Sequence, residues 1–107
     1  MKLDEFSEKL GLKLVCGSTD KEVTGCYAGD LLSWVMSHAT LGDAWVTIMS
    51  NVNVIAVASL TETACVIMAE GVMPEPDIIS VAEEKDVTVF SDDRSVYEIC
   101  REIGKIL

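Results

Sequence analysis

Apolar residues recur along the chain with two different periods, which indicates a mixture of helices and strands. Leu3, Phe6 and Leu10 have helical spacing, and Gly11 is a typical residue for a helix end. Short runs of consecutive apolar residues instead predict strands that are buried on both faces. We expect three such strands, at residues 44–49, 64–69 and 87–90.

A helical segment follows each of these three strands. The first is predicted from about Val52 to Leu60, and the second opens in the segment 74–77, where proline and acidic residues suit a first turn. Ser95 and Glu98 form a capping box before the last helix. Toward the N-terminus, we expect a short strand at residues 13–16 and an extended piece at 22–28, which Gly25 interrupts and which lies at an edge of the sheet or in a loop. A helix capped by Asp30 is expected at residues 30–41. The β-α-β-α-β-α order predicts an α/β fold with right-handed crossovers and a mainly parallel sheet.

Polar residues follow the three predicted strands. If these strands are parallel, their carboxyl ends lie along one rim of the sheet, where α/β folds tend to bind ligands. Hydroxyl, amide and backbone N–H groups there suit an anion or the edge of a nucleobase, through hydrogen bonds and helix dipoles. The candidate ligand-binding residues are Thr47, Ser50, Asn51, Asn53, Gly71, Ser91 and Asp92.

Purely structural roles are an alternative at several of these positions. Ser50 and Asn51 could simply cap the following helix, and Ser91 could begin a turn. Asp92 with Asp93 could bind Mg²⁺, but acidic residues ahead of a helix are also ordinary first-turn residues. Asn53 lies in an otherwise apolar helix, so we expect its amide to need a polar partner.

Length and charge narrow the class of protein. A chain of 107 residues with half of them apolar predicts one domain over residues 1–107 with its own core. The formal net charge is −10, with eleven acidic and four basic residues in the segment 61–107. An acidic surface repels phosphate backbones, so nucleic acid is not an expected partner. The acidic residues form either a solvated surface or a face that binds a basic partner.

Membrane segments and obvious catalytic motifs are lacking. No apolar run approaches the ~20 residues of a membrane span, and the first residues lack the apolar stretch of a signal peptide, so a cytoplasmic location is expected. There is no glycine-rich nucleotide motif and no nucleophile paired with a base. We therefore expect neither an enzyme nor a cofactor.

The four cysteines and the single histidine predict structural roles. The cysteines contain no C-x-x-C pair, so no metal site is expected. Cys65 and Cys100 lie within apolar patterns, whereas a disulfide between Cys16 and Cys26 stays open. His38 falls near a predicted helix end, without a serine or cysteine partner nearby.

Three segments resemble the DRTGG domain family. Residues 22–33 read EVTGCYAGDLLS, residues 42–48 read GDAWVTI, and residues 53–60 read NVIAVASL. The resemblance spans nearly the whole chain. It departs from the name-giving motif at Lys21, where arginine is common, and at Cys26, where a second glycine is common; Asn51 stands where a histidine is expected.

The resemblance implies a three-layer α/β/α fold like the N-terminal domain of HPr kinase/phosphorylase. It also implies a regulatory or dimerising role without catalysis, since DRTGG domains accompany CBS pairs in regulated pyrophosphatases or occur alone near hydrogenase components. It marks Thr24, Gly25, Asp30 and Ser33 as family-motif residues, together with the rim positions Thr47 and Asn53.

Two functional hypotheses result. The first is a non-catalytic module that senses a small anionic metabolite or an adenine nucleotide at the rim. The second is a protein-interaction module without a small ligand, which dimerises or binds a redox or hydrogenase partner. A homodimer is expected because two tryptophans and a large apolar fraction leave apolar surface to share, and an exposed Trp34 would be a strong contact there.

Overall fold

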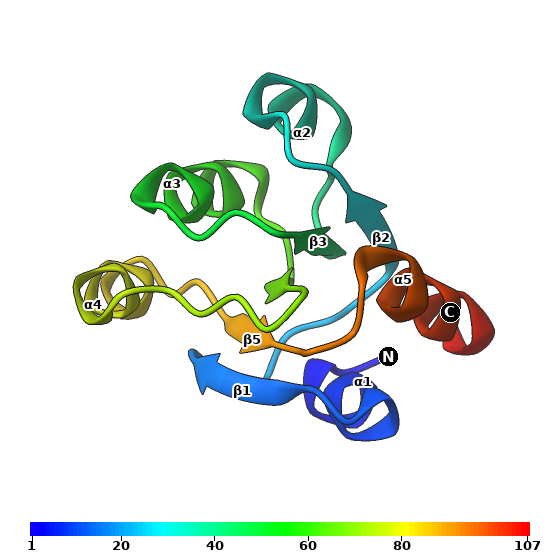
Figure 1. Cartoon of the computed structure of the whole chain (residues 1–107). Helices are drawn as coiled ribbons and strands as arrows, with labels where there is room; N and C mark the ends of the chain where they lie inside the picture. The colour runs from blue at the N-terminus through cyan, green and yellow to red at the C-terminus, as the bar shows by residue number, and fades with distance from the viewer.

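A five-stranded sheet lies between two layers of helices in the computed structural model, which describes all 107 residues (Figure 1). The helices α2, α3 and α4 cover one face of the sheet, and α1 and α5 cover the other (Figure 1). In chain order the elements are α1 (Leu3–Leu10), β1 (Lys13–Cys16), β2 (Gly25–Ala28), α2 (Leu32–His38), β3 (Asp43–Thr47), α3 (Val52–Thr61), β4 (Cys65–Met68), α4 (Pro76–Glu84), β5 (Val89–Ser91) and α5 (Val96–Ile106).

The strands are arranged in the order β1-β5-β4-β3-β2. The four strands β2, β3, β4 and β5 run parallel to one another, and β1 pairs antiparallel with β5 at one edge. The predicted three-layer α/β/α fold with a mainly parallel sheet is confirmed. The extended piece predicted over 22–28 forms a strand only from Gly25 to Ala28, and it is the other edge of the sheet.

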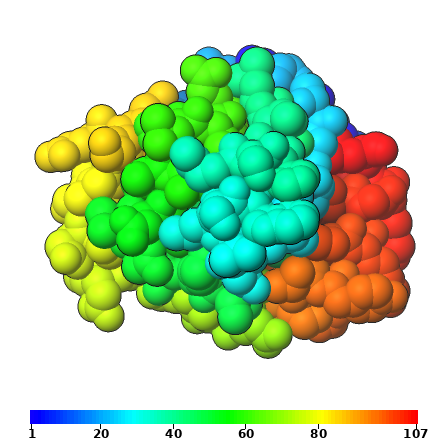
Figure 2. Space-filling view, turned by 90° about the horizontal axis from the view of Figure 1, so that it is seen from above, coloured from blue at the N-terminus to red at the C-terminus, as the bar shows by residue number.

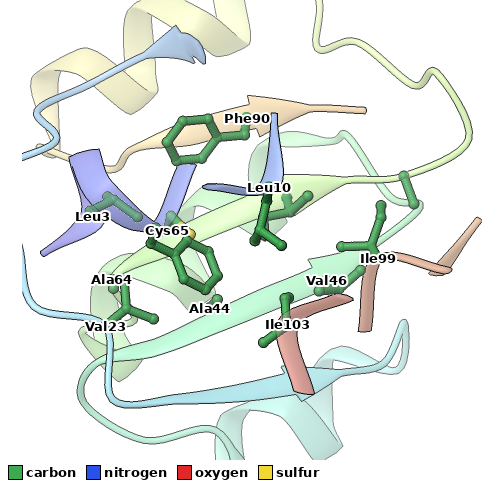
Figure 3. Packing of buried hydrophobic residues seen from close by; sticks show 13 residues of the cluster. Leu3, Leu10, Val23, Ala44, Val46, Ala64, Cys65, Phe90, Ile99 and Ile103 are labelled. Atoms are coloured by element: carbon green, nitrogen blue, oxygen red, sulfur yellow. The ribbon is translucent and has the colours of Figure 1, made fainter. Parts of the chain in front are cut away.

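The central strands are buried and mostly apolar because both of their faces are covered by helices. Successive side chains of a strand point to opposite faces, so Ala44 and Val46 of β3 join one core cluster and Trp45 joins the other. Figure 3 shows the cluster on the side of α1 and α5, which includes Phe90 of β5 and Ile99 of α5. All five residues of β3 and all four of β4 are buried.

The helix ends follow the local sequence. Gly11 ends α1 with a left-handed backbone, and Asn51 begins α3 by accepting hydrogen bonds from the N–H groups of Asn53 and Val54. Ser95 caps α5 through the predicted capping box, in which its hydroxyl accepts from the N–H of residue 98. The capping alternative for Asn51 is therefore realised.

Asp30 does not cap α2 as its position predicted. The N-cap residue is Leu31, which makes no side-chain cap bond. The Asp30 carboxylate instead accepts hydrogen bonds from Thr47 Oγ1 at 2.7 Å and from the N–H of Ile48 at 3.1 Å. Asp30 makes this longer-range contact instead of a local cap, because the buried hydroxyl of Thr47 needs a hydrogen-bond partner.

The capping box gives a direct stability prediction. Ser95→Ala removes the acceptor for an otherwise unpaired N–H of the last helix, and we expect it to lower the free energy of unfolding by about 1 kcal/mol. Urea denaturation followed by circular dichroism measures this change. Ser80→Ala is the matched control, because the Ser80 hydroxyl lies within α4 and bonds only to the carbonyl of Pro76. Equal stability of Ser95→Ala and the wild type would contradict the assigned role of the cap.

Candidate functional site

The carboxyl ends of β2, β3, β4 and β5 lie along one edge of the sheet, because these four strands are parallel. We call this edge the carboxyl rim. Thr47 and Ser91 end β3 and β5 at the rim, Asn53 lies in the first turn of α3, and the other candidates lie in the loops that follow the strands, at Ser50, Asn51, Gly71 and Asp92. The predicted gathering of these loops at one edge is therefore confirmed.

Two neighbouring loops of the rim leave the sheet toward opposite faces. The chain passes from β4 to α4 on one face, and from β5 to α5 on the other. In open α/β sheets, ligands bind where adjacent strands diverge in this way, since the parting loops leave a crevice between them. The helices α2, α3 and α4 all share one face, so among the four parallel strands the divergence occurs only between β4 and β5.

A cavity of about 310 Å³ lies at this point of divergence. We call it the rim cavity. Its lining comes from the β4–α4 loop, the β5–α5 loop and the segment that leads into β1, namely Gly11, Lys13, Gly71, Met73, Ser91, Asp92 and Asp93. Three of the candidate ligand-binding residues, Gly71, Ser91 and Asp92, thus lie around one cavity.

The walls of the rim cavity are held by hydrogen bonds. The Ser91 hydroxyl donates to the carbonyl of Val72 at 2.8 Å, which joins the two loops. The N–H of Gly71 donates to the carbonyl of Asp92 at 2.9 Å. A preformed, rigid lining of this kind reduces the entropy cost of binding a ligand.

Asp92 and Arg94 form an ion pair at the rim. Both Nε and Nη2 of Arg94 donate to the carboxylate of Asp92 at 2.8 Å, and Nη2 also donates to the carbonyl of Leu10 at 2.6 Å. The hydrogen bonds from Arg94 hold the pKa of Asp92 below its ordinary value of 3.8. Asp92 therefore stays ionised but is already paired.

Lys13 and Asp93 are the charged groups that remain available in the rim cavity. Both residues are exposed, and neither makes a hydrogen bond or ion pair through its side chain within the chain. One ammonium and one carboxylate can bind a molecule that carries both an anionic group and hydrogen-bond donors.

The candidates on the β3–α3 loop lie apart from the rim cavity. Strand β4 separates β3 from β5, a distance of roughly 10 Å at ordinary strand spacing. Thr47 is buried and bonded to Asp30, whereas Asn53 is exposed in the first turn of α3. Because water reaches Asn53, its amide does not require the protein partner that the apolar pattern led us to expect. None of these four candidates, Thr47, Ser50, Asn51 and Asn53, lines the rim cavity.

The family-motif residues divide between the two edges of the sheet. Asp30 and Ser33 are at the carboxyl rim, and Asp30 has the structural contacts given above, while Ser33 is exposed. Gly25 begins β2 at the opposite edge, and Thr24 directly precedes it. Two positions here require glycine. A Cβ at Gly25 would lie 2.6 Å from Asp43 Oδ1, and a Cβ at Gly42 would lie 2.4 Å from Thr24 Oγ1. The motif thus packs β2 tightly against β3.

A larger cavity of about 630 Å³ lies at the amino ends of the parallel strands. Sequence reasoning missed it, because its lining comes from four separate stretches of the chain, 21–24, 41–42, 58–64 and 85–87, which share no motif. The lining residues are Lys21, Glu22, Thr24, Leu41, Gly42, Ala58, Ser59, Glu62, Thr63, Ala64, Lys85, Asp86 and Val87. Lys21 is already bound there to the carbonyl of Asp86, at 2.6 Å.

The cysteines do not form a reactive or metal-binding cluster. Desolvation raises the pKa of Cys26 to about 12 and also raises the pKa of Cys16 and Cys100, so the thiols stay protonated. Cys16 and Cys26 lie on β1 and β2, the two outer strands of the sheet, so the disulfide left open by the sequence cannot form. No group of three His, Cys, Asp or Glu side chains is placed to hold a metal ion.

His38 has a structural setting. It ends α2, and its ring stacks on the Trp34 ring with 4.8 Å between centroids. Its Nδ1 lies 2.8 Å from the carbonyl of Trp34 and 2.9 Å from the hydroxyl of Ser37. The expectation that His38 has no serine partner nearby is therefore wrong, because the adjacent Ser37 turns its hydroxyl toward the ring. No helix has both the length and the apolar character needed to cross a membrane.

The fold is similar to a solved structure. It superposes with a TM-score of 0.76 on the CBS and DRTGG domains of the regulatory region of Clostridium perfringens pyrophosphatase, solved with the activator diadenosine tetraphosphate. The identity is 15%, and the match covers 95% of this chain but 45% of that one, so this chain spans less than half the length of its neighbour. The sequence matches no protein-family model and no curated protein. The DRTGG-like fold expected from the sequence is thus confirmed.

The pKa shift of Asp92 predicts a pH-dependent stability. Its folded pKa is depressed, so the stabilisation is fully present above the ordinary carboxyl pKa and is lost as the pH falls through the lower folded value. We expect Asp92→Asn to lower the free energy of unfolding by about 1–3 kcal/mol at neutral pH and to flatten its decline below about pH 4. Denaturation curves across this pH range measure both effects.

Asp93→Asn is the control for this experiment. Asp93 is the exposed neighbour of Asp92 and makes no ion pair, so we expect its replacement to leave the stability and its pH profile unchanged. A pH profile of Asp92→Asn identical to that of the wild type would show that the pair with Arg94 does not stabilise the rim.

Proposed function

We propose that this DRTGG-like domain is a non-catalytic regulatory module that senses a small molecule in the rim cavity. The observation that carries the proposal is the place of the cavity, at the divergence of β4 and β5, with an unpaired ammonium and an unpaired carboxylate in its lining. The rigid walls of the cavity and the lack of a paired acid and base favour binding over catalysis.

An adenine mononucleotide or a similar small anionic metabolite is the ligand class that we propose. Lys13 would pair with the anionic group, and Asp93 would accept from an amino or hydroxyl group. A volume of about 310 Å³ lies at the lower end of the range of roughly 300–1,000 Å³ for ligand sites, which favours a mononucleotide over a dinucleoside polyphosphate. The activator-bound neighbour supports a ligand-regulated role, but this fold accounts for less than half of that chain.

Thermal unfolding with adenosine, AMP, ATP and diadenosine tetraphosphate tests the proposal. A ligand at one hundred times its dissociation constant contributes about 2.7 kcal/mol, which should raise Tm by roughly 10 °C or more in a domain of this size. We expect the largest shift with AMP. Lys13→Gln should reduce the shift with the nucleotides but not any shift with adenosine, because adenosine carries no anionic group.

Lys85→Gln is the matched control, since Lys85 lines the larger cavity at the opposite edge of the sheet. It should leave the nucleotide shift unchanged. If none of the four compounds raises Tm, the proposed ligand class is wrong. If Lys85→Gln abolishes the shift while Lys13→Gln preserves it, the ligand binds at the other edge.

The second candidate function is docking of a basic face of a redox or hydrogenase partner. It is favoured by the exposed acidic side chains of α4 and its N-cap, namely Glu75, Asp77, Glu83 and Glu84. Such a complex should weaken as salt rises from about 0.1 to 1 M, because the Debye length falls from about 10 to 3 Å. Co-purification that is insensitive to salt would count against electrostatic docking.

A further inference from the structure

The larger cavity, of about 630 Å³, takes no part in the proposed binding at the rim. We call it the amino-end cavity, because it lies where the parallel strands begin. Its volume is about twice that of the rim cavity and falls within the range of roughly 300–1,000 Å³ for ligand sites. Three of its lining residues, Ala58, Ala64 and Val87, are apolar and buried. The lining thus offers both an apolar surface and charged groups to a small molecule.

Three helices end at the same edge of the sheet as this cavity. Each of α2, α3 and α4 begins after one parallel strand at the carboxyl rim and leads back to the start of the next strand. Figure 2 shows them side by side, with α2 in cyan, α3 in green and α4 in yellow. The C-cap residues of α3 and α4, Glu62 and Lys85, both line the cavity. The carboxyl end of a helix carries a partial negative charge, so these helix ends favour a positively charged group.

Three charged side chains of the lining are already paired. The Lys21 ammonium donates to the carbonyl of Asp86 at 2.6 Å and lies 3.8 Å from the carboxylate of the same residue. The Glu22 carboxylate lies 2.9 Å from the N-terminal amino group. Glu62 and Lys85, in contrast, are exposed, and their side chains make no hydrogen bond or ion pair within the chain. One carboxylate and one ammonium are therefore available to a ligand in the amino-end cavity.

Glu62 has a backbone conformation that its residue type does not favour. Its φ of 56° and ψ of 38° lie in the left-handed region, where glycine is the usual residue at a helix end. The N–H of Gly42 donates to the carbonyl of Glu62 at 3.2 Å and helps to hold this conformation. Asp86, with a φ of 54°, lines the same cavity, and such residues tend to gather at binding sites. A glutamate retained where glycine would be more stable indicates a use for its carboxylate.

We propose that the amino-end cavity is a second ligand site, for a small zwitterionic molecule of the amino-acid type. Glu62 and the carboxyl ends of α3 and α4 bind its ammonium group, and Lys85 binds its carboxylate. The buried apolar part of the lining contacts the rest of the molecule. The proposal is independent of the ligand at the rim, because the two cavities share no lining residue.

The arrangement of the two available charges selects a zwitterion. Because α3 and α4 pack against each other, their axes lie roughly 8–10 Å apart, and one amino acid can reach both C-cap residues. A simple amine would leave Lys85 unpaired, whereas a simple carboxylate would be repelled by Glu62 and by the helix ends. A molecule that carries both charges close together matches this lining.

Titration of the ¹⁵N-labelled full chain with the twenty common amino acids, in pools at about 1 mM each, tests the proposal by amide chemical shifts. We expect at least one of them to shift the amides of Gly42, Glu62 and Asp86 and to leave those of the rim cavity unchanged. Two analogues of that amino acid, one without the ammonium group and one without the carboxylate, should each bind about tenfold more weakly or worse.

Substitutions at the two C-cap residues test the assigned contacts. Glu62→Gly removes the carboxylate and relieves the left-handed strain, so it should weaken binding about tenfold or more while Tm stays equal or rises. Glu62→Gln, which keeps the size of the side chain, should weaken binding likewise. Lys85→Gln should also weaken it, whereas Lys13→Gln, in the rim cavity, should not.

Glu70→Gly is the matched control. Glu70 is the third non-glycine residue with a left-handed backbone, and it lines neither cavity. Its replacement by glycine should relieve the same strain and leave the affinity for the amino acid unchanged.

Three outcomes would overturn the proposal. The first is the absence of any shift around the amino-end cavity with all twenty amino acids. The second is an analogue with only one charge that binds as tightly as the amino acid, since the lining would then not recognise a zwitterion. The third is an equal loss of affinity in Glu62→Gly and Glu70→Gly, which would show that the Glu62 carboxylate makes no specific contact with the ligand.

Discussion

The divergence of the chain after β4 and β5 is the constraint on which the candidate site depends. One loop turns to the face covered by α4 and the other to the face covered by α5, so the two must be tied together where they part. Backbone bonds from Gly71 to Asp92 and from Glu70 to Arg94 make this tie, and the Ser91 hydroxyl adds a third bond to the carbonyl of Val72. These bonds fix the positions of the two loops, and the rim cavity lies between the loops and the start of β1.

The site is therefore built mainly from groups that are already satisfied. Asp92 is paired with Arg94, and Arg94 also reaches the carbonyl of Leu10, so α1 is attached to the same point. The groups available to a ligand are few, with Lys13 and Asp93 as the unpaired charges. The proposed recognition of a small molecule therefore rests on a small number of contacts.

Much of the fold could be predicted from the sequence because it is encoded locally. The residues of β3 and β4 are buried on both faces only if helices cover both sides of the sheet, so their sequences predict two helical layers. The capping box at Ser95 fixes the start of α5 within a few residues. Asp30 shows where local reasoning fails. Its sequence position suggests a helix cap, but its carboxylate accepts a hydrogen bond from the buried hydroxyl of Thr47 in β3, seventeen residues further along the chain.

The candidate site was predictable only in part for the same reason. The sequence indicates which residues follow parallel strands, so Gly71, Ser91 and Asp92 could be placed at one rim. It does not give the order of the strands, and β4 separates the β3–α3 loop from the β5–α5 loop. Gly11 and Lys13 could not be assigned to the site either. Gly11 lies just before β1 and Lys13 begins it, and the position of this antiparallel edge strand depends on pairing with β5.

A titration of the ¹⁵N-labelled chain with AMP, followed by amide chemical shifts, tests the central claim most directly. The account predicts that the largest shifts fall on the loops around the rim cavity, at Gly71, Ser91 and Asp93, with little change at the other edge of the sheet. Shifts concentrated at Thr24, Gly42 and Glu62 would place binding in the larger cavity at the amino ends of the strands and contradict the account. The absence of any shift at millimolar AMP would contradict it as well.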